Sequence, residues 1–202
     1  RQAFMKVKEE SREERQPILE VLKTYPKQVL LAMGARFGEN GAFYIYSVFV
    51  LTYATQHVKM SQQVVLNAML IGAGLELIAI PFFGAMSDRF GRRPVYLFGA
   101  IATAVWAYPL FKLLDTGSPP LVGLALIVAF VFSHAAMYGP QAAFFSELFG
   151  TRVRYSGASL GAQLAAVLAG GTSPFIATLL LANYGTNALS LYVIFMAAVT
   201  IV

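Results

Sequence analysis

Long runs of apolar residues constrain this chain more than any other feature. Six segments are dominated by apolar side chains, and most of them are long enough for a helix to cross a bilayer, which takes about 20 residues. Of the 202 residues, 57% are hydrophobic and 12% are charged, whereas soluble domains carry about 25% charged residues. The sequence therefore predicts an all-α, polytopic membrane protein.

The predicted spans follow a polar N-terminal arm. Residues 1–27 carry seven of the fifteen lysines and arginines, and we interpret them as a cytoplasmic linker with some helix. The predicted six-helix transmembrane domain covers residues 28–202, with spans at 28–55, 62–83, 95–114, 121–145, 156–181 and 187–202. Because the last span stops inside an apolar run, we expect the chain to be part of a longer protein.

Lysine and arginine are unevenly distributed among the predicted loops. Seven lie in the arm, three lie in the stretch 84–94, and two are Arg152 and Arg154, whereas the opposite side has Lys59 and Lys112. The positive-inside rule makes the first side cytoplasmic. The basic residues therefore indicate topology, so we expect the bilayer as a partner and no nucleic acid.

The stretch 84–94 is predicted to be the short cytoplasmic turn of a membrane hairpin. It reads Gly-Ala-Met-Ser-Asp-Arg-Phe-Gly-Arg-Arg-Pro. Glycine at its start permits a close helix crossing, and glycine near its end permits a tight reversal. An aspartate suits a helix N-terminus or an arginine as partner. The residues that we single out are Gly84, Asp88, Arg89, Gly91, Arg92 and Arg93.

This stretch resembles the loop signature of the major facilitator superfamily, G-x-x-x-D-R-x-G-R-R, which follows the second helix of each six-helix half. A second stretch, 139–161, contains E-L-F-x-T-x-x-R and R-Y-S-G-x-S-L-G, and a later G-G-x-x-P follows it. With these motifs the chain resembles the metabolite:proton symporters, which include shikimate, α-ketoglutarate, citrate and proline/betaine permeases.

The resemblance covers essentially the whole chain and has several implications. The spans would be helices seven to twelve of a twelve-helix major facilitator fold, and the N-terminal six-helix half would be missing from this chain. Glu147 and Arg154 would join the arginines of the signature in a cytoplasmic gate. The alternative for these charges is a set of solvated surface pairs, each worth little.

Apart from Lys112 near the end of the third span, four residues with an acidic or basic side chain fall inside the predicted spans. Because such residues are costly in a membrane, Arg36, Glu39, Glu76 and His134 are functional candidates. Arg36 and Glu39 are three residues apart, so they can share a helix face and neutralise each other, which would be a purely structural role. Glu76 is a candidate proton site. His134 could change charge near neutral pH or could make a helix-to-helix hydrogen bond.

Further polar side chains in the spans are candidates for lining a substrate cavity, although tyrosines are also ordinary packing residues. They are Asn40, Tyr44, Tyr138, Gln141 and Gln163. The sequence contains no P-loop, H-E-x-x-H or metal-ligand cluster. We therefore expect no metal, no cofactor and no catalytic residue.

Together with the resemblance, these residues lead us to expect a secondary active transporter in a bacterial inner membrane. It would carry a small anionic metabolite together with a proton by alternating access between two six-helix halves. One alternative is an antiporter or exporter of drugs or metabolites with the same fold. Another is an intramembrane hydrolase that uses Ser159 and His134, because 157–161 matches G-x-S-x-G. A third is a structural subunit without transport activity.

Overall fold

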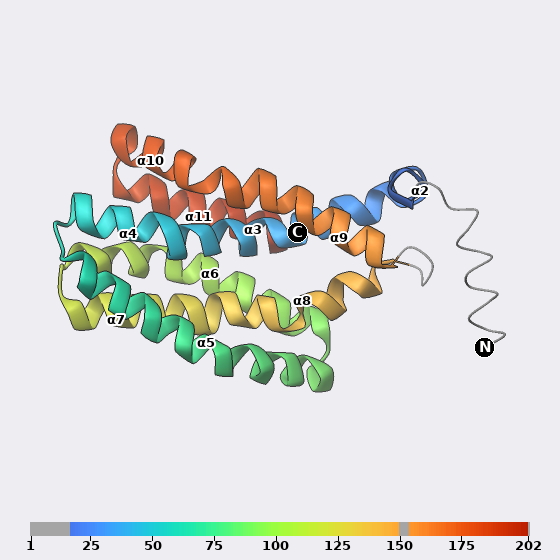
Figure 1. Cartoon of the computed structure of the whole chain (residues 1–202), viewed down its shortest axis with the longest axis horizontal. Coiled ribbons are helices and arrows are strands. Elements are labelled where there is room, and N and C mark those ends of the chain that lie inside the picture. The colour runs from blue at the N-terminus through green and yellow to red at the C-terminus, as the bar shows by residue number, and fades with distance from the viewer. Residues whose placement is uncertain (1–16, 150–153, 202) are drawn as a thin grey trace.

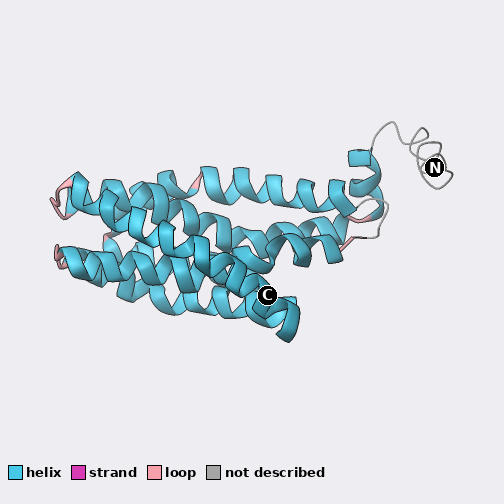
Figure 2. Ribbon diagram, turned by 60° about the horizontal axis from the view of Figure 1, so that its bottom comes forward, coloured by secondary structure: helices cyan, strands magenta, loops and turns pink. Residues whose placement is uncertain are grey.

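The computed structural model describes residues 17–149 and 154–201, and these residues form helices without a strand. A short helix, α2 (Pro17–Thr24), precedes six long helical rods that run up and down in an elongated bundle (Figures 1 and 2). Most of the predicted N-terminal arm, residues 1–16, and Arg152 lie outside the described residues. The all-α fold predicted from the apolar runs is therefore confirmed.

Each rod is a continuous helix, and three of the rods contain π-helical segments. Their elements are, in chain order, α3 (Pro26–Tyr44), η1 (Ile45–Phe49), α4 (Val50–Thr52) and η2 (Tyr53–His57); α5 (Gln62–Phe90); α6 (Arg92–Asp115); α7 (Pro119–Val128), η3 (Ala129–His134) and α8 (Ala135–Glu147); α9 (Arg154–Ala165), η4 (Ala166–Gly171) and α10 (Ser173–Tyr184); and α11 (Thr186–Ile201). Most rods extend past the predicted apolar spans, because a spanning helix continues into the polar interfacial region.

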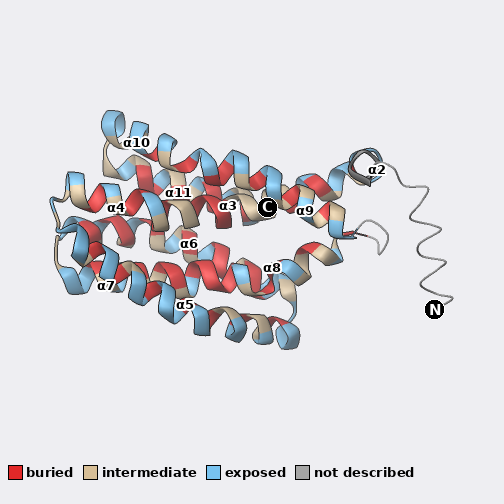
Figure 3. Ribbon diagram, in the orientation of Figure 1, coloured by how far each residue is buried: buried red, intermediate tan, exposed pale blue. Residues whose placement is uncertain are grey.

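Four rods are long and apolar enough to cross a membrane, namely Gln62–Phe90, Arg92–Asp115, Pro119–Glu147 and Arg154–Tyr184. The first rod carries the polar run that includes Arg36, Glu39 and Asn40. The last, Thr186–Ile201, is a shorter apolar helix. Buried residues face the inside of the bundle, and large apolar residues such as Leu70, Leu77 and Phe175 stay exposed, as on a surface that faces lipid (Figure 3).

The turn predicted at 84–94 is much shorter than expected, and the prediction of an eleven-residue turn is wrong. Helix α5 continues to Phe90, where the Gly91 amide still donates to the Ser87 carbonyl at 3.0 Å, and α6 begins at Arg92. The whole reversal falls on Gly91, whose φ of 97° is one that glycine adopts without strain. The residues before it continue the α5 helix.

Helices α5 and α8 cross so closely that their backbones nearly touch. A Cβ added to Gly139 would lie 2.6 Å from the Ile80 carbonyl oxygen and 2.9 Å from the Gly84 amide nitrogen. Two facing glycines allow this approach because neither has a side chain to hold the helices apart. The crossing brings the polar residues of α5, η3 and α8 toward α3, and the functional candidates meet there.

Candidate functional site: a buried polar network

Four polar side chains lie buried where α3, α5, η3 and α8 meet. They are Glu39, Glu76, His134 and Gln141, and each residue is between 1 and 7% exposed. Glu39 comes from α3, Glu76 from α5, His134 from the end of η3, and Gln141 from α8. Charged groups are costly at membrane depth unless they are paired, so the contacts among these residues decide what the site can do.

His134 joins the two buried carboxylates. Its Nε2 lies 2.9 Å from Oε1 of Glu39, and its Nδ1 contacts Oε1 of Glu76. The imidazole ring stacks with two aromatic rings, and its centroid lies 4.5 Å from that of Phe43 and 5.3 Å from that of Tyr138. The stacking fixes the plane of the ring, so both nitrogens stay directed at their carboxylates.

The contacts of His134 limit how protons are shared in this trio, because each nitrogen–oxygen contact needs one hydrogen. A neutral imidazole has a single N–H. The trio therefore contains either an imidazolium and two carboxylates, or a neutral imidazole, one carboxylic acid and one carboxylate. Both arrangements hold the same number of protons and carry one net negative charge.

Arg36 balances that negative charge. Its Nε lies 3.8 Å from Oε2 of Glu39, which is a long ion pair, and this Nε has no hydrogen-bond partner among the described residues. Its Nη1 instead donates to Oε1 of Gln141 at 3.1 Å, and Nε2 of Gln141 donates to Oε2 of Glu39 at 2.7 Å. The amide of Gln141 thus lies between the guanidinium and the carboxylate, and the network as a whole is neutral.

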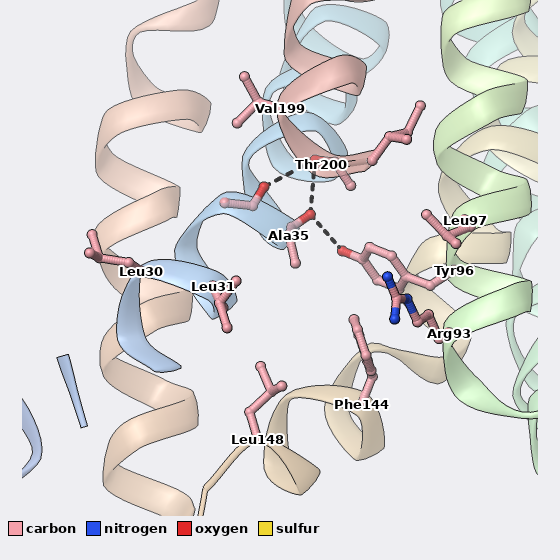
Figure 4. Close-up of a pocket in the computed structure, with 12 residues that line it drawn as sticks. Leu30, Leu31, Ala35, Arg93, Tyr96, Leu97, Phe144, Leu148, Val199 and Thr200 are labelled. Carbon is pink, nitrogen blue, oxygen red and sulfur yellow. Dashed lines mark hydrogen bonds between the residues drawn. The ribbon is translucent and has the colours of Figure 1, made fainter. Parts of the chain in front are cut away.

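Tyr96 of α6 also belongs to this network, although it is not among the site residues predicted from the sequence. Its hydroxyl lies 3.4 Å from Nε2 of Gln141 and donates to the Ala35 carbonyl at 3.0 Å. Figure 4 shows the Tyr96 hydroxyl directed at that carbonyl, which also accepts a hydrogen bond from Thr200. Nothing in the local sequence distinguishes Tyr96 from a packing tyrosine, because its role depends on the crossing of α3, α6 and α8.

Two cavities border the network. One of about 660 Å³ lies between α3, α8 and α9, and Arg36, Gln141, Tyr138, Arg154 and Ser159 are among its lining residues. Its lining contains two arginines and no carboxylate. Glu39 is not among the lining residues, but it contacts both Arg36 and Gln141, which are. The cavity therefore presents positive charge and hydrogen-bond donors, as a small anion would require.

The other cavity, of about 450 Å³, lies beyond Tyr96 and is mainly apolar (Figure 4). Two leucines of α3, Leu97 of α6, Phe144 of α8 and Leu148 just after α8 form much of its lining, with Arg93 and Tyr96 at one side. Of the three arginines in the signature stretch, Arg93 is the one that lines this cavity. This cavity offers few polar partners to a ligand.

Three of the polar candidates do not join the network. Asn40 is buried, and its Oδ1 has no partner among the described residues. Asn40 and Tyr44 pack on η4, where a Cβ added to Gly170 would lie 2.8 Å from Cε2 of Tyr44. Gln163 is exposed on α9. Tyr138, by contrast, reaches both His134 and the cavity.

The signature stretch forms a second group of charges at the end of the bundle where α5 meets α6. Arg92 pairs with Asp88, lies 3.6 Å from Glu147 through its Nε, and donates to Oγ of Ser87 at 2.6 Å. The guanidinium of Arg89 lies over the Phe90 ring at 5.6 Å. Arg92 therefore connects the α5–α6 turn with the end of α8.

The hydrolase alternative does not fit this geometry. Ser159 lies on helix α9 and lines the larger cavity, but His134 is not among the residues that line it. Both ring nitrogens of His134 are occupied by Glu39 and Glu76, so neither is free to take a proton from a serine. The described residues also contain no group of three side chains arranged to hold a metal ion.

Comparison with known proteins gives a consistent family assignment. The sequence profile described as "Major Facilitator Superfamily" matches residues 8–202. A shikimate transporter of Escherichia coli (strain K12) is 35% identical over 171 residues, which are 85% of this chain and 39% of the relative. An inner membrane metabolite transport protein of the same strain is 30% identical, over 98% of this chain and 46% of the relative.

A proline/betaine transporter of Escherichia coli is 27% identical over 89% of this chain and 36% of the relative. The chain thus spans less than half the length of each of these relatives and corresponds to about their C-terminal half. No solved structure matches the chain at a significant level. The three relatives are named as transporters rather than as enzymes.

Proposed function

The chain belongs to the Major Facilitator Superfamily, and we propose that it forms the C-terminal six-helix half of a symporter that moves a small anionic metabolite together with a proton. The observation that carries the proposal is the buried network of Arg36, Glu39, Glu76 and His134. A purely structural ion pair would need only one cation and one anion, each the partner of the other. This network instead joins two carboxylates through a histidine, and Nε of Arg36, a residue that lines the larger cavity, has no hydrogen-bond partner in the described part of the chain.

The carboxylate of a substrate would bind Arg36 from the larger cavity and compete with Glu39. The empty network is neutral, so a bound anion adds one negative charge to a poorly solvated site. Uptake of one proton restores neutrality, and Glu39 is the carboxylate next to Arg36. Protonation of Glu39 weakens its hold on Arg36, and so anion and proton favour each other's binding.

The names of two relatives support a substrate with a carboxylate group. Shikimate, proline and betaine are chemically diverse, but each carries a carboxylate. Arginine is the side chain best suited to bind that group, because its planar guanidinium can donate two parallel hydrogen bonds. We expect the missing N-terminal half to provide the other wall of the site, and no cofactor other than the proton.

The charges at the α5–α6 turn would act as a cytoplasmic gate. Arg92 connects α5 with α8 through Asp88 and Glu147, and such pairs can break when two bundles rock against each other. The lysine and arginine distribution supports a cytoplasmic position for this end, and the bacterial relatives support a location in the inner membrane.

Transport by the full-length protein in proteoliposomes tests the proposal. Counterflow with shikimate, proline and betaine would identify the substrate without any ion gradient. An inward proton gradient should then drive accumulation of that substrate, and a protonophore should abolish it. Accumulation driven by an outward proton gradient would favour the alternative, an antiporter or exporter with the same fold. A failure to transport any carboxylate in the panel would contradict the proposal.

A further inference from the structure

Gln141 occupies the position in the network where a substrate carboxylate is expected. Its Oε1 accepts a hydrogen bond from Nη1 of Arg36 at 3.1 Å, as a carboxylate oxygen would. Its Nε2 donates to Oε2 of Glu39 at 2.7 Å. Gln141 also lines the larger cavity together with Arg36, so a ligand in the cavity can reach both side chains.

We propose that the Gln141 amide couples anion binding to protonation, because it holds Arg36 in the place of the substrate and at the same time keeps Glu39 ionised. This proposal rests on the proposed function and assigns the coupling role to one residue. A substrate carboxylate that binds Arg36 displaces Oε1 of Gln141. When the amide rotates away, Glu39 loses the hydrogen bond from Nε2.

The remaining surroundings of Glu39 explain why losing one donor matters. On its own helix it faces Arg36, whose charge is then shared with the substrate. From η3 it contacts Nε2 of His134, and the other ring nitrogen, Nδ1, contacts Glu76 on α5. From α6 the hydroxyl of Tyr96 hydrogen-bonds with Gln141 and the Ala35 carbonyl rather than with Glu39 in the described part of the chain. Oε2 of Glu39 is then left without its donor in a buried site and takes up a proton from the cavity.

Three Gln141 variants test the two parts of this mechanism separately, namely displacement of the amide from Arg36 and protonation of Glu39. The experiments use purified full-length protein and shikimate as the probe. Gln141→Leu removes both hydrogen bonds, so shikimate should still bind, but without the proton uptake that accompanies binding in the wild type. Gln141→Glu supplies a permanent carboxylate to Arg36 and should weaken shikimate binding about tenfold, within the range typical of coupled sites. Gln141→Asn keeps the amide but shortens the side chain, and should also reduce proton uptake.

Exposed Gln63 provides matched controls. It lies near the start of α5, and its Nε2 donates to Asn67 at 2.9 Å, far along the helix from Glu76. Gln63→Leu and Gln63→Glu make the same chemical changes and should leave both measurements at the wild-type level. Binding would be measured by isothermal titration calorimetry, and proton uptake by repeating the titration in buffers of different ionisation enthalpy.

The outcomes distinguish failure of this inference from failure of the proposed function. If wild-type protein binds shikimate without taking up a proton, the proposed coupling fails and the inference fails with it. If the wild type takes up a proton and Gln141→Leu takes up as much per bound shikimate, Gln141 is not the coupling residue. If Gln141→Leu does not fold, the shikimate affinity of Gln141→Glu is the remaining test. An affinity equal to that of the wild type would overturn the inference.

Discussion

At the residue scale, His134 explains how two carboxylates can stay buried in apolar helices. Its two nitrogens contact Glu39 and Glu76, and the rings of Phe43 and Tyr138 stack on the imidazole. The sequence identified the charged members of this network because a charge inside a span is costly and needs a reason. Of its aromatic members, Tyr138 was among the candidates, whereas Phe43 and Tyr96 were not, because each resembles an ordinary packing residue of its span.

Arg36→Lys should weaken substrate binding while leaving the protein folded. Lysine keeps the charge but loses the planar pair of donors, so one hydrogen bond to the carboxylate is lost. A hydrogen bond to a charged group contributes about 1.5 kcal/mol, which corresponds to about a tenfold increase in Kd. Calorimetric titration of the full-length variant would measure this. An unchanged Kd would mean that Arg36 does not bind the substrate.

At the element scale, the glycines determine how the helices approach one another. The sequence predicted a close crossing at Gly84, but its partner Gly139 lies more than fifty positions further along the chain and only the fold brings them together. The motif also did not predict the length of the α5–α6 turn. Polar residues at the end of a membrane helix can either continue the helix or form a loop, and the residue types alone do not distinguish the two. Arg36 and Glu39 were identified for the opposite reason, since their spacing alone puts them on one face.

Gly139→Ala should destabilise the bundle. The added methyl would meet backbone atoms of Ile80 and Gly84, which cannot move aside as a side chain can, and overpacking of this kind costs about 2 kcal/mol. Gly123→Ala is the matched control, since nothing lies within 4 Å of an added Cβ there. Thermal unfolding in detergent should show a lower Tm for the first variant and an equal or higher Tm for the second. Equal Tm values would contradict the described α5–α8 crossing.

Asp88→Asn should slow transport while the protein remains in the membrane. The substitution keeps the shape of the side chain but removes the charge that pairs with Arg92, and Arg92 would then rely on the weaker contact with Glu147. Asp88 is largely exposed, so little stability should be lost. Uptake rate and membrane abundance would be compared in the same cells. Normal uptake by the variant would mean that residues 84–94 only set the orientation of the protein in the membrane.

At the scale of the whole molecule, the two ends of the bundle should lie on opposite sides of the membrane. The α5–α6 turn at Gly91 should face the cytoplasm, and the loop at Gly117 between α6 and α7 should face outward. The sequence has no cysteine, so this half can be labelled at single introduced sites. In a cysteine-free full-length protein, an impermeant maleimide added outside should label Thr116→Cys but not Phe90→Cys. The reverse pattern would overturn the orientation.

The most direct test of the central claim is to compare uphill uptake and counterflow in the variant Glu39→Gln. Glutamine resembles the protonated carboxyl group, so it should release Arg36 and still allow substrate to exchange across the membrane. It cannot gain or lose a proton, so an inward proton gradient should no longer drive accumulation. We therefore expect counterflow near the wild-type rate and no uphill uptake. If Glu39→Gln still concentrates substrate against a gradient, the Arg36–Glu39 pair is structural, and the proton must bind at Glu76 or in the other half of the transporter.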